Sequence, residues 1–473
     1  MNTLARRDVP PAPESFYAAH QKVYPREITG RYARLRVHAV WLLLGIYYVL
    51  PWLQWDGRPA VLFDLPARKF WIFGLTFWPQ DFFFMAWLLI IAALSLFFVT
   101  AIAGRLWCGY ACPQTVWTEA FLWMERLTEG GHAQRRKLDK GPWTREKLFR
   151  KGTKQVLWVA FALWTGLTFV GYFSPIGPLA VDFAGFNAGP WETFWVLFYG
   201  LATYANAGLL REQVCKYMCP YARFQSVMFD KDTMVISYDR KRGEPRGGRK
   251  RSVDFRAAGL GSCIDCHVCV QACPTGIDIR DGLQIECIAC AACVDACDGV
   301  MDRMGYPRGL VRYTTHHAME ENRPVRVLRP RVAVYGALLL ALVGGFGWAV
   351  AARTTLIVDV IRDRGTLYRE LPGGLIENVY TVKLVNKSEA AREYRISVEG
   401  LPGLALAMDA AQPVAAGAGE VTRLPLRLRA PADAVPAEGA DVTLVIEANG
   451  DTPETVSAGT RFLGPAAGDG AAP

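Results

Sequence analysis

Cysteine is the residue type in this chain whose spacing points most directly to chemistry. Eight of the twelve cysteines fall between positions 263 and 297, in two successive runs of the form C-x2-C-x2-C-x3-C. The runs comprise Cys263, Cys266, Cys269 and Cys273, followed by Cys287, Cys290, Cys293 and Cys297. Thiolates at this density bind iron or other soft metals.

The spacing itself selects among those metals. Bacterial-type ferredoxins use it to hold two [4Fe–4S] clusters, and the fourth cysteine of each run ligates the other cluster. The alternative is a pair of zinc sites, but these usually separate their C-x2-C pairs by a dozen or more residues. We therefore expect an electron-transfer protein. Cluster 1 is assigned to Cys263, Cys266, Cys269 and Cys297, and cluster 2 to Cys287, Cys290, Cys293 and Cys273.

The other four cysteines form two C-x3-C-P motifs. Cys108 and Cys112 lie in RLWCGYACPQTVW, and Cys215 and Cys219 lie in REQVCKYMCPYARFQ. If each segment is helical, residues four apart share one face, so the two sulfurs of a pair point the same way. Arginine precedes each pair and favours the thiolate form. The recurrence predicts a duplicated unit that offers up to four thiolates.

Several kinds of site fit these four thiols. Soft thiolate ligands suit Cu(I) particularly well, so a copper site is the sharpest hypothesis. Buried cysteine is also often only a small hydrophobe. Zinc, a redox-active dithiol and a third iron–sulfur cluster remain alternatives, whereas a disulfide is disfavoured in a reducing compartment. The spacing alone does not separate copper from these alternatives.

The elements that position the cysteines are apolar. The chain has 473 residues, of which 52% are hydrophobic. Residues 82–103 carry no charge and exceed the roughly 20 residues that cross a bilayer core. We predict five spans in all, at about 38–55, 82–103, 156–174, 190–210 and 332–352.

Charge predicts how those spans are oriented. Lysine and arginine are concentrated in 105–154 and 211–331, whereas 174–190 has none. Because positive loops stay in the cytoplasm, we place the N-terminus and all the cysteines on that side, and the C-terminal region on the other. The net charge of +9 then reflects topology and attraction to membrane lipid, and not a nucleic-acid partner.

The C-terminal region follows a different pattern. Apolar and polar residues alternate with period two around Tyr394–Val398, Leu424–Leu428 and Val442–Ile446, and Gly-, Pro- and Ala-rich turns separate these segments. This pattern predicts a small antiparallel sandwich. The composition of residues 465–473 predicts a disordered tail, and residues 1–16 are expected to be disordered as well.

The whole layout resembles the cytochrome c oxidase accessory protein family of bacteria, CcoG/FixG/RdxA. The resemblance covers most of the chain. It is carried by both C-x3-C-P motifs, the double ferredoxin run, DACDGVMDRMGYPRGLVRYTT after it, and VDVIRDRGTLYRELPGGLIENVYTVKLVNKS after the last span.

The resemblance implies a fold class and a location. The expected fold is a multi-pass α-helical protein of the bacterial inner membrane with an inserted 2[4Fe–4S] ferredoxin domain and a C-terminal immunoglobulin-like sandwich. The expected segments are a cytoplasmic N-terminus 1–37, four spans in 38–210 with a basic loop 105–155, a cytoplasmic segment 211–331 with the ferredoxin domain at about 255–305, a fifth span 332–352, a periplasmic domain 353–464 and a tail 465–473.

The resemblance also implies an activity. Members of this family are regarded as copper handlers that reduce Cu(II) to Cu(I) for assembly of the cbb3-type oxidase. Cys108, Cys112, Cys215 and Cys219 would then bind copper or relay electrons. The implied partners are a cytoplasmic electron donor and a periplasmic copper chaperone or oxidase subunit. One local departure from the general ferredoxin pattern is Asp298, which follows Cys297 where Pro274 follows Cys273, so the two clusters need not share one potential.

Two other functions compete with copper reduction. The first is a conduit that oxidises quinol, as NapH-like polyferredoxins are thought to do. The second is a non-redox assembly scaffold whose working part is the exported sandwich. The long C-terminal region favours the oxidase-assembly family over the quinol conduit.

Overall fold

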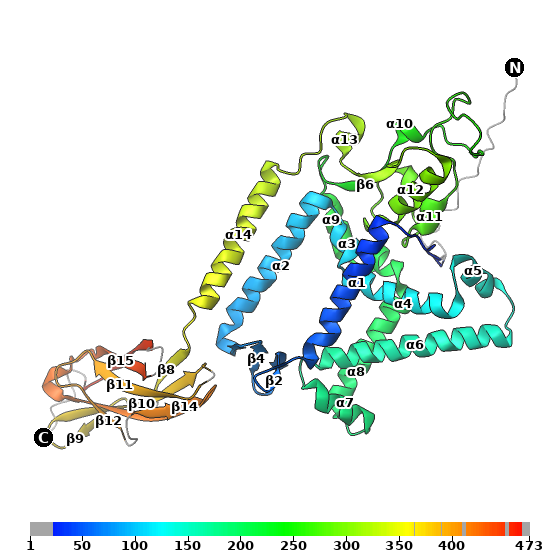
Figure 1. Ribbon diagram of the computed structural model, residues 1–473. Helices are drawn as coiled ribbons and strands as arrows, with labels where there is room; N and C mark the ends of the chain where they lie inside the picture. The colour runs from blue at the N-terminus through cyan, green and yellow to red at the C-terminus, as the bar shows by residue number, and fades with distance from the viewer. Residues whose placement is uncertain (1–21, 364, 389, 409–412, 450–453, 466–473) are drawn as a thin grey trace, which may run out of the picture. The chain divides into compact units, whose positions relative to one another are not determined.

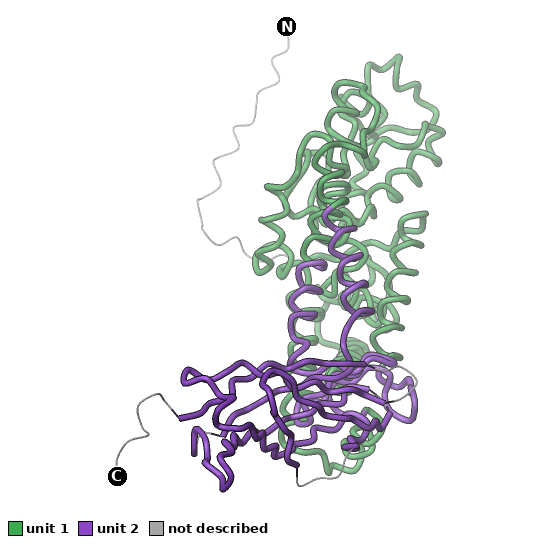
Figure 2. The backbone as a smooth tube through the Cα atoms, turned by 90° about the vertical axis from the view of Figure 1, so that its left-hand side faces the viewer, with its two compact units in different colours: residues 1–50, 93–171, 176–337 green, residues 51–92, 172–175, 338–473 purple. Residues whose placement is uncertain are grey.

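The computed structural model describes residues 22–363, 365–388, 390–408, 413–449 and 454–465 (Figure 1). The predicted disordered residues 1–16 lie outside these ranges, as does the tail from 466 onward. The chain divides into two compact units (Figure 2). Unit 1 comprises residues 1–50, 93–171 and 176–337, and unit 2 comprises 51–92, 172–175 and 338–473.

Helices dominate the first 350 residues. The longer ones, in chain order, are α1 (Arg31–Val49), α2 (Phe82–Ala103), α4 (Pro113–Glu129), α5 (His132–Lys140), α6 (Arg145–Val170), α7 (Ile176–Ala184), α8 (Pro190–Thr203), α9 (Pro220–Val227), α12 (Ala292–Met304) and α14 (Pro330–Ala351). Short helices α3 (Leu106–Tyr110), α10 (Arg240–Gly243), α11 (Val268–Ala272) and α13 (His316–Glu320) lie between them. Two π-helical segments, η3 (Tyr204–Leu210) and η4 (Val214–Met218), follow α8.

Three of the described helical segments are long and apolar enough to cross a membrane. They are Arg31–Trp52, Pro79–Ala103 and Pro330–Ala351. The predicted spans at 156–174 and 190–210 do not meet this standard. The first ten residues of α6 include six charged ones, and α8 is only 14 residues long before the helix widens into η3. The structure therefore supports membrane association but not the five-span count.

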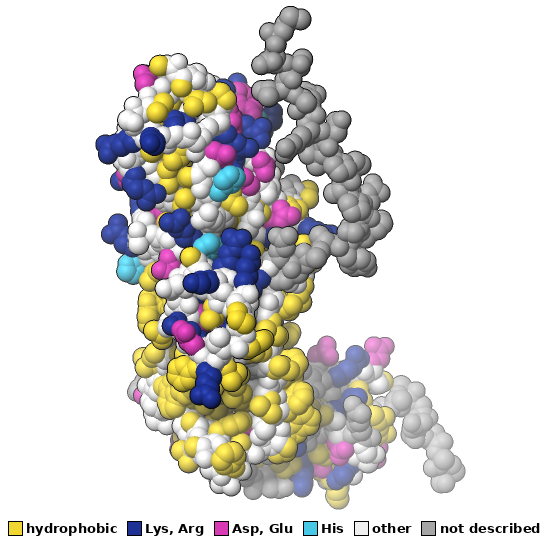
Figure 3. Space-filling view, turned by 90° about the vertical axis from the view of Figure 1, so that its right-hand side faces the viewer, with side chains coloured by type: hydrophobic (Ala, Val, Ile, Leu, Met, Phe, Trp, Pro, Cys, Tyr) yellow, Lys and Arg dark blue, Asp and Glu magenta, His cyan; other side chains and the backbone are white. Residues whose placement is uncertain are grey.

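The outer surface of α6 and α8 is nevertheless apolar. Figure 3 shows hydrophobic side chains gathered over the part of unit 1 that contains these helices, and Lys and Arg gathered over its opposite end. The exposed apolar residues there include Val156, Leu163, Phe194, Leu197 and Leu201. Soluble proteins rarely expose so many contiguous apolar side chains, so this surface is suited to a lipid environment.

The ferredoxin region of unit 1 is built on a two-stranded ribbon. Strand β6 (Val235–Tyr238) pairs antiparallel with β7 (Val311–Thr314), and α11 and α12 lie between them in the sequence. Helix α12 is fixed to the start of α1, because the Asp295 carboxylate accepts the Ala33 backbone N–H at 2.7 Å. A carboxylate at a helix N-terminus is favourable because unpaired N–H groups and the positive end of the helix dipole lie there.

The C-terminal part of unit 2 is an all-β sandwich, as the alternating pattern predicts. One sheet has the order β12-β14-β10-β8, with β9 also paired to β10, and the other has the order β13-β11-β15-β16. The strands are β8 (Leu356–Arg362), β9 (Arg369–Leu371), β10 (Leu375–Asn386), β11 (Arg392–Glu399), β12 (Ala405–Met408), β13 (Val414–Ala416), β14 (Val421–Pro431), β15 (Ala440–Asn449) and β16 (Glu454–Phe462).

The core of the sandwich comes from the alternating residues. Leu426 of β14 and Leu444 and Ile446 of β15 are fully buried in one hydrophobic cluster. Unit 2 also contains short strands at and after the end of the first predicted span: β1 (Gln54–Trp55), β2 (Arg58–Pro59), β3 (Val61–Asp64), β4 (Lys69–Ile72) and β5 (Leu75–Phe77). A buried ion pair, Lys387 Nζ to Asp81 Oδ1 at 2.8 Å, joins the sandwich to the segment that precedes α2.

Candidate iron–sulfur and thiol centres

The eight cysteines of the double run line two small cavities in unit 1. One cavity is bordered by four of them, and the other by the remaining four together with Cys269. The first set is Cys263, Cys266, Cys269 and Cys297, and the second is Cys273, Cys287, Cys290 and Cys293. These sets are the two crossed groups that the spacing predicts. Four thiols around one apolar cavity are what a [4Fe–4S] cluster requires, so the residues present fit that cofactor.

The backbone repeats between the two runs. In the first, Asp265 and His267 flank Cys266 and have φ of 55° and 56°. In the second, Ala289 and Ala291 flank Cys290 and have φ of 51° and 59°. Left-handed conformations at four residues other than glycine are costly and persist only where the fold enforces them. Each cavity is therefore enclosed by its own loop, and the two loops have the same strained conformation.

The two C-x3-C-P motifs also share one local structure. Cys112 is the N-cap of α4, with Pro113 at the first helical position, and Cys219 is the N-cap of α9, with Pro220 in the same role. Proline is favoured there because its fixed φ suits the helix and its missing N–H costs nothing. The prediction that each pair lies on one face of a continuous helix is wrong, because the second cysteine of each pair has an extended backbone.

The structure nevertheless brings the four thiols together. Cys108 lies within electrostatic range of Cys112, Cys215 and Cys219, and Cys112 lies within range of Cys219. Cys108 and Cys215 also pack against Ile288 and Cys290 in one hydrophobic cluster. The two motifs therefore form one site, which lies against the loop that carries a cluster 2 cysteine.

Gly109 makes that close approach fit. A Cβ atom added at Gly109 would lie 2.7 Å from the Ile288 carbonyl oxygen and 2.8 Å from the Cys290 Cα. Contacts below 3.0 Å with backbone atoms do not occur for real Cβ atoms. Helix α3 can therefore touch the cluster loop only because glycine stands between Cys108 and Cys112.

Burial sets the protonation of two of these thiols, Cys108 and Cys215. It raises the pKa of Cys108 to about 12 and of Cys215 to about 11, and the neighbouring thiols add to the rise. Arg105 lowers the pKa of both, as the sequence predicts for a nearby arginine, but burial outweighs it. Cys108 and Cys215 are therefore protonated near neutral pH until a metal displaces the protons.

Two further side chains hold this site: Arg105, which is the arginine that precedes the first motif, and Gln225, which no pattern in the sequence marks. The buried Arg105 donates to the carbonyls of Ile285, in the cluster loop, and Ala222, in α9. Gln225, fully buried on α9, accepts from the Cys108 thiol at 3.4 Å. Arg105 and Gly109 could have been identified as site residues from the sequence because they lie next to Cys108. Gln225 has no comparable signal.

Within the described ranges, no three or more His, Cys, Asp or Glu side chains are gathered closely enough to hold one metal ion. This concerns sites for a single ion, because the cysteines around a cubane each bind a different iron. The structure therefore gives no independent support for resident copper at the four thiols.

Family models match three parts of the chain. A 4Fe–4S dicluster domain matches residues 210–316, which contain the eight run cysteines and the second C-x3-C-P motif. A 4Fe–4S binding domain matches residues 85–129, which contain the first motif. The model described as an immunoglobulin-like fold at the C-terminus of FixG matches residues 346–465.

Similar proteins cover most of the chain. The nitrogen fixation protein FixG of Rhizobium meliloti is 38% identical over 82% of this chain and 80% of its own length. Protein RdxB of Cereibacter sphaeroides is 42% identical over 84% of this chain and 85% of its own. Protein RdxA of the same organism is 39% identical over 90% of this chain and 93% of its own. The chain belongs to the FixG/RdxA family of iron–sulfur electron-transfer proteins, as the motifs predict.

Proposed function

We propose that this protein reduces Cu(II) to Cu(I) at the site formed by Cys108, Cys112, Cys215 and Cys219, in the service of cbb3-type oxidase assembly. The observation that supports this most strongly is the contact at Gly109. Helix α3 lies directly against the backbone of Cys290, so the thiol site and cluster 2 are neighbours. Copper is here the substrate, so a permanent single-ion site is not required.

The electrons balance in one step. A reduced [4Fe–4S] cluster supplies one electron, and Cu(II) needs one to become Cu(I). The chain's own residues favour this direction, because thiolate sulfur binds Cu(I) better than it binds Cu(II). As copper binds, the Cys108 and Cys215 thiols lose protons that burial otherwise holds in place.

The order of the two clusters follows from their surroundings. Cys269 belongs to the first ligand set but also lines the second cavity, so the cavities are adjacent. Cys266, of the first set, is exposed, whereas Cys290, of the second, is buried against the thiol site. In this proposal Cys263, Cys266, Cys269 and Cys297 would hold the cluster that accepts electrons from a cytoplasmic donor, and Cys273, Cys287, Cys290 and Cys293 would hold the cluster that supplies them to copper at the thiol site.

The partners and the orientation in the membrane belong to the same proposal. The apolar helices associate with membrane lipid, and the cysteines lie on the cytoplasmic side of the bacterial inner membrane. The C-terminal sandwich lies in the periplasm and contacts a copper chaperone or an oxidase subunit. The basic segments that flank the cysteines support this orientation.

A second candidate is favoured by one finding. A 4Fe–4S binding model matches residues 85–129, which include Cys108 and Cys112. On this reading the four thiols hold a third cluster, and the protein is an electron conduit, with quinol as one electron source. A third cluster would change the iron content, which makes the two candidates separable.

The test uses the whole chain, purified anaerobically, to measure its iron, sulfide and copper content. Cu(II) reduction is assayed in membranes that contain it. The variant Cys112→Ser with Cys219→Ser should lose copper binding and reduction while iron content stays that of the parent. Cys266→Ser is the control and should lose iron but keep copper binding. A fall in iron in the double variant would establish the third cluster, and unchanged copper binding would overturn the proposal.

A further inference from the structure

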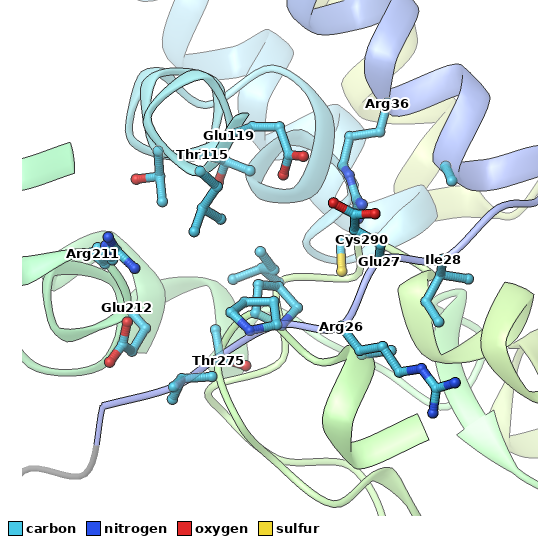
Figure 4. A pocket seen from close by; sticks show the side chains of 18 of the residues that line it. Arg26, Glu27, Ile28, Arg36, Thr115, Glu119, Arg211, Glu212, Thr275 and Cys290 are labelled. Atoms are coloured by element: carbon cyan, nitrogen blue, oxygen red, sulfur yellow. The ribbon is translucent and has the colours of Figure 1, made fainter. Parts of the chain in front are cut away.

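A third cavity in unit 1, larger than the two cluster cavities, adjoins both redox centres. It has a volume of about 260 Å³, and Cys290 of cluster 2 and Cys215 of the thiol site both line it. Its other walls come from residues 23–29, the first turns of α1, and α4. We call this space the arginine cavity. Figure 4 shows Arg36 and Arg211 on opposite sides of it, with Thr115 and Thr275 also facing the space.

The charges that line the arginine cavity are unequal. Five arginines and three glutamates border it. Arg126 is neutralised, because its guanidinium lies 2.9 Å from Glu119 and 3.4 Å from Glu27. The third glutamate is Glu212. Four arginines then remain against this one glutamate, so the lining of the cavity carries a net positive charge.

Two of those arginines are buried and share one carboxylate. Arg135 and Arg211 both contact Oε2 of Glu125, at 3.3 and 2.8 Å, and Glu125 does not line the cavity. Arg135 is 1% exposed and Arg211 is 7% exposed. The other oxygen of Glu125 already has Lys22 at 3.7 Å. Lys22 has its own closer partner in Asp139, at 2.8 Å, so the two buried guanidinium groups share the single negative charge of Glu125.

The same arginines have hydrogen-bond donors to spare. Nη1 of Arg211, Nε of Arg135 and Nε of Arg36 are buried and have no hydrogen-bond partner among the residues that the structure describes. Buried N–H groups are almost always paired, because leaving one unpaired forfeits its hydration. These donors are themselves buried, as is the equally unpaired Oε1 of Glu125, so they show that the wall does not satisfy its own guanidinium groups. The net positive charge of the lining is what calls for an anion in the cavity.

The rest of the wall indicates what carries that acceptor. Ile28, Val37, Leu122 and Trp123 give the cavity a large apolar surface. A bare inorganic anion would leave this surface uncovered. A ligand with one multiply charged oxygen group and an apolar body would satisfy both parts, and planar guanidinium groups match phosphate oxygens well.

We propose that the arginine cavity binds a phosphate-type anion carried on a small apolar body, next to cluster 2. Arg36 lies within electrostatic range of Cys290, so a bound anion would offset positive charge beside that cluster. Less positive charge lowers a cluster's reduction potential, so binding would make cluster 2 a stronger reductant. The inference rests on the iron–sulfur clusters and not on copper as the substrate.

Two sources offer this chemistry: an anionic phospholipid and a soluble phosphate ester. The test uses the holoprotein, prepared anaerobically in nanodiscs of neutral lipid. The probes are inorganic phosphate, flavin mononucleotide, and nanodiscs that contain phosphatidylglycerol. Calorimetry measures binding of the soluble probes, and redox titration by paramagnetic resonance measures the potential of cluster 2. A fall in potential with phosphatidylglycerol alone identifies lipid, and binding of flavin mononucleotide with the same fall identifies a soluble ester.

Variants connect either result to the cavity. Arg36→Gln and Arg211→Gln should each weaken binding by at least roughly tenfold, since each removes a charge-assisted donor. Glu212→Gln should strengthen it and does not remove any arginine. The matched control is Arg136→Gln on α5, which is exposed and does not border the cavity. The proposal is overturned if no probe binds at low ionic strength, or if the cavity variants weaken binding no more than Arg136→Gln does.

Discussion

The two cluster cavities have the same loops but different surroundings. Each is enclosed by a run in which the residues on both sides of the second cysteine are left-handed. Around the first cavity, Arg280 is offset by Asp278 and Asp265, and Asp298 lies close to Cys297. Around the second, Arg36 acts on Cys290 and Arg105 acts on Cys287.

This difference assigns different tasks to the two clusters. Positive charge near a cluster stabilises its reduced form, which is the more negative one, and so raises the reduction potential, whereas burial lowers it. Net charge is a main determinant of the potential. Cluster 2 has the more positive surroundings and the contact with the thiols, so we expect it to hold the higher potential. The repeated loop thus provides the cluster ligands, and the different charged residues packed around the two clusters determine the direction of electron transfer.

The largest effect should come from removing a ligand on one side or the other. Cys290→Ser should abolish Cu(II) reduction with every reductant, because cluster 2 is the neighbour of the thiols. Cys266→Ser should abolish reduction with the natural donor but retain it in protein that dithionite has reduced beforehand and that is freed of dithionite before Cu(II) is added, because dithionite can reduce cluster 2 directly and would also reduce free Cu(II). Reduction assays in membranes with both reductants check this. Equal loss in the two variants with dithionite would show that the clusters do not act in this order.

The thiols beside cluster 2 should make copper binding depend strongly on pH. The pKa of Cys108 is about 12 and that of Cys215 about 11, so both thiols are protonated from pH 6 to 9. Each proton displaced by Cu(I) then raises the affinity by roughly tenfold per pH unit. Competition with a Cu(I) chelator at pH 6, 7 and 8 measures this rise. A pH-independent affinity would mean that the thiols are already ionised or do not bind copper.

The sequence predicts ligands better than it predicts surroundings. The crossed sets of cysteines follow from spacing, because the first three cysteines of each run wrap one cluster and the fourth reaches the other. The alternating residues from Tyr394 to Ile446 predict the sandwich. Span count was less predictable: α6 begins with charged residues that belong to the same helix as its apolar part. Long-range neighbours such as Arg36 and Cys290 are 254 positions apart (290 minus 36), and no local pattern connects them.

A substitution at Gly109 tests whether the close contact between α3 and the cluster 2 loop is the electron route to the thiol site. Gly109→Ala places a Cβ against the backbone of Ile288 and Cys290, so α3 must move away. We expect slower Cu(II) reduction, both clusters retained, and about 1–3 kcal/mol less stability, which is the usual cost of overpacking. Gly152→Ala on α6 is the control. Nothing lies within 4 Å of its added Cβ, so it should leave reduction unchanged. Normal reduction in Gly109→Ala would mean that the close contact is not the electron route.

The smallest effect should be a shift of potential confined to cluster 1. Arg280 is 4% exposed and lies near Cys269, whereas Asp298 lies near Cys297. Arg280→Gln should lower the potential of cluster 1 and Asp298→Asn should raise it, because a reduced cluster is the more negative form. Arg308→Gln, which removes an exposed arginine paired with Asp302, is the control. Redox titration followed by paramagnetic resonance resolves the two clusters. Of the two cluster cavities, Arg280 borders only the first. A shift in the potential of cluster 2 as large as that of cluster 1 would therefore contradict the idea that different charges control the two clusters.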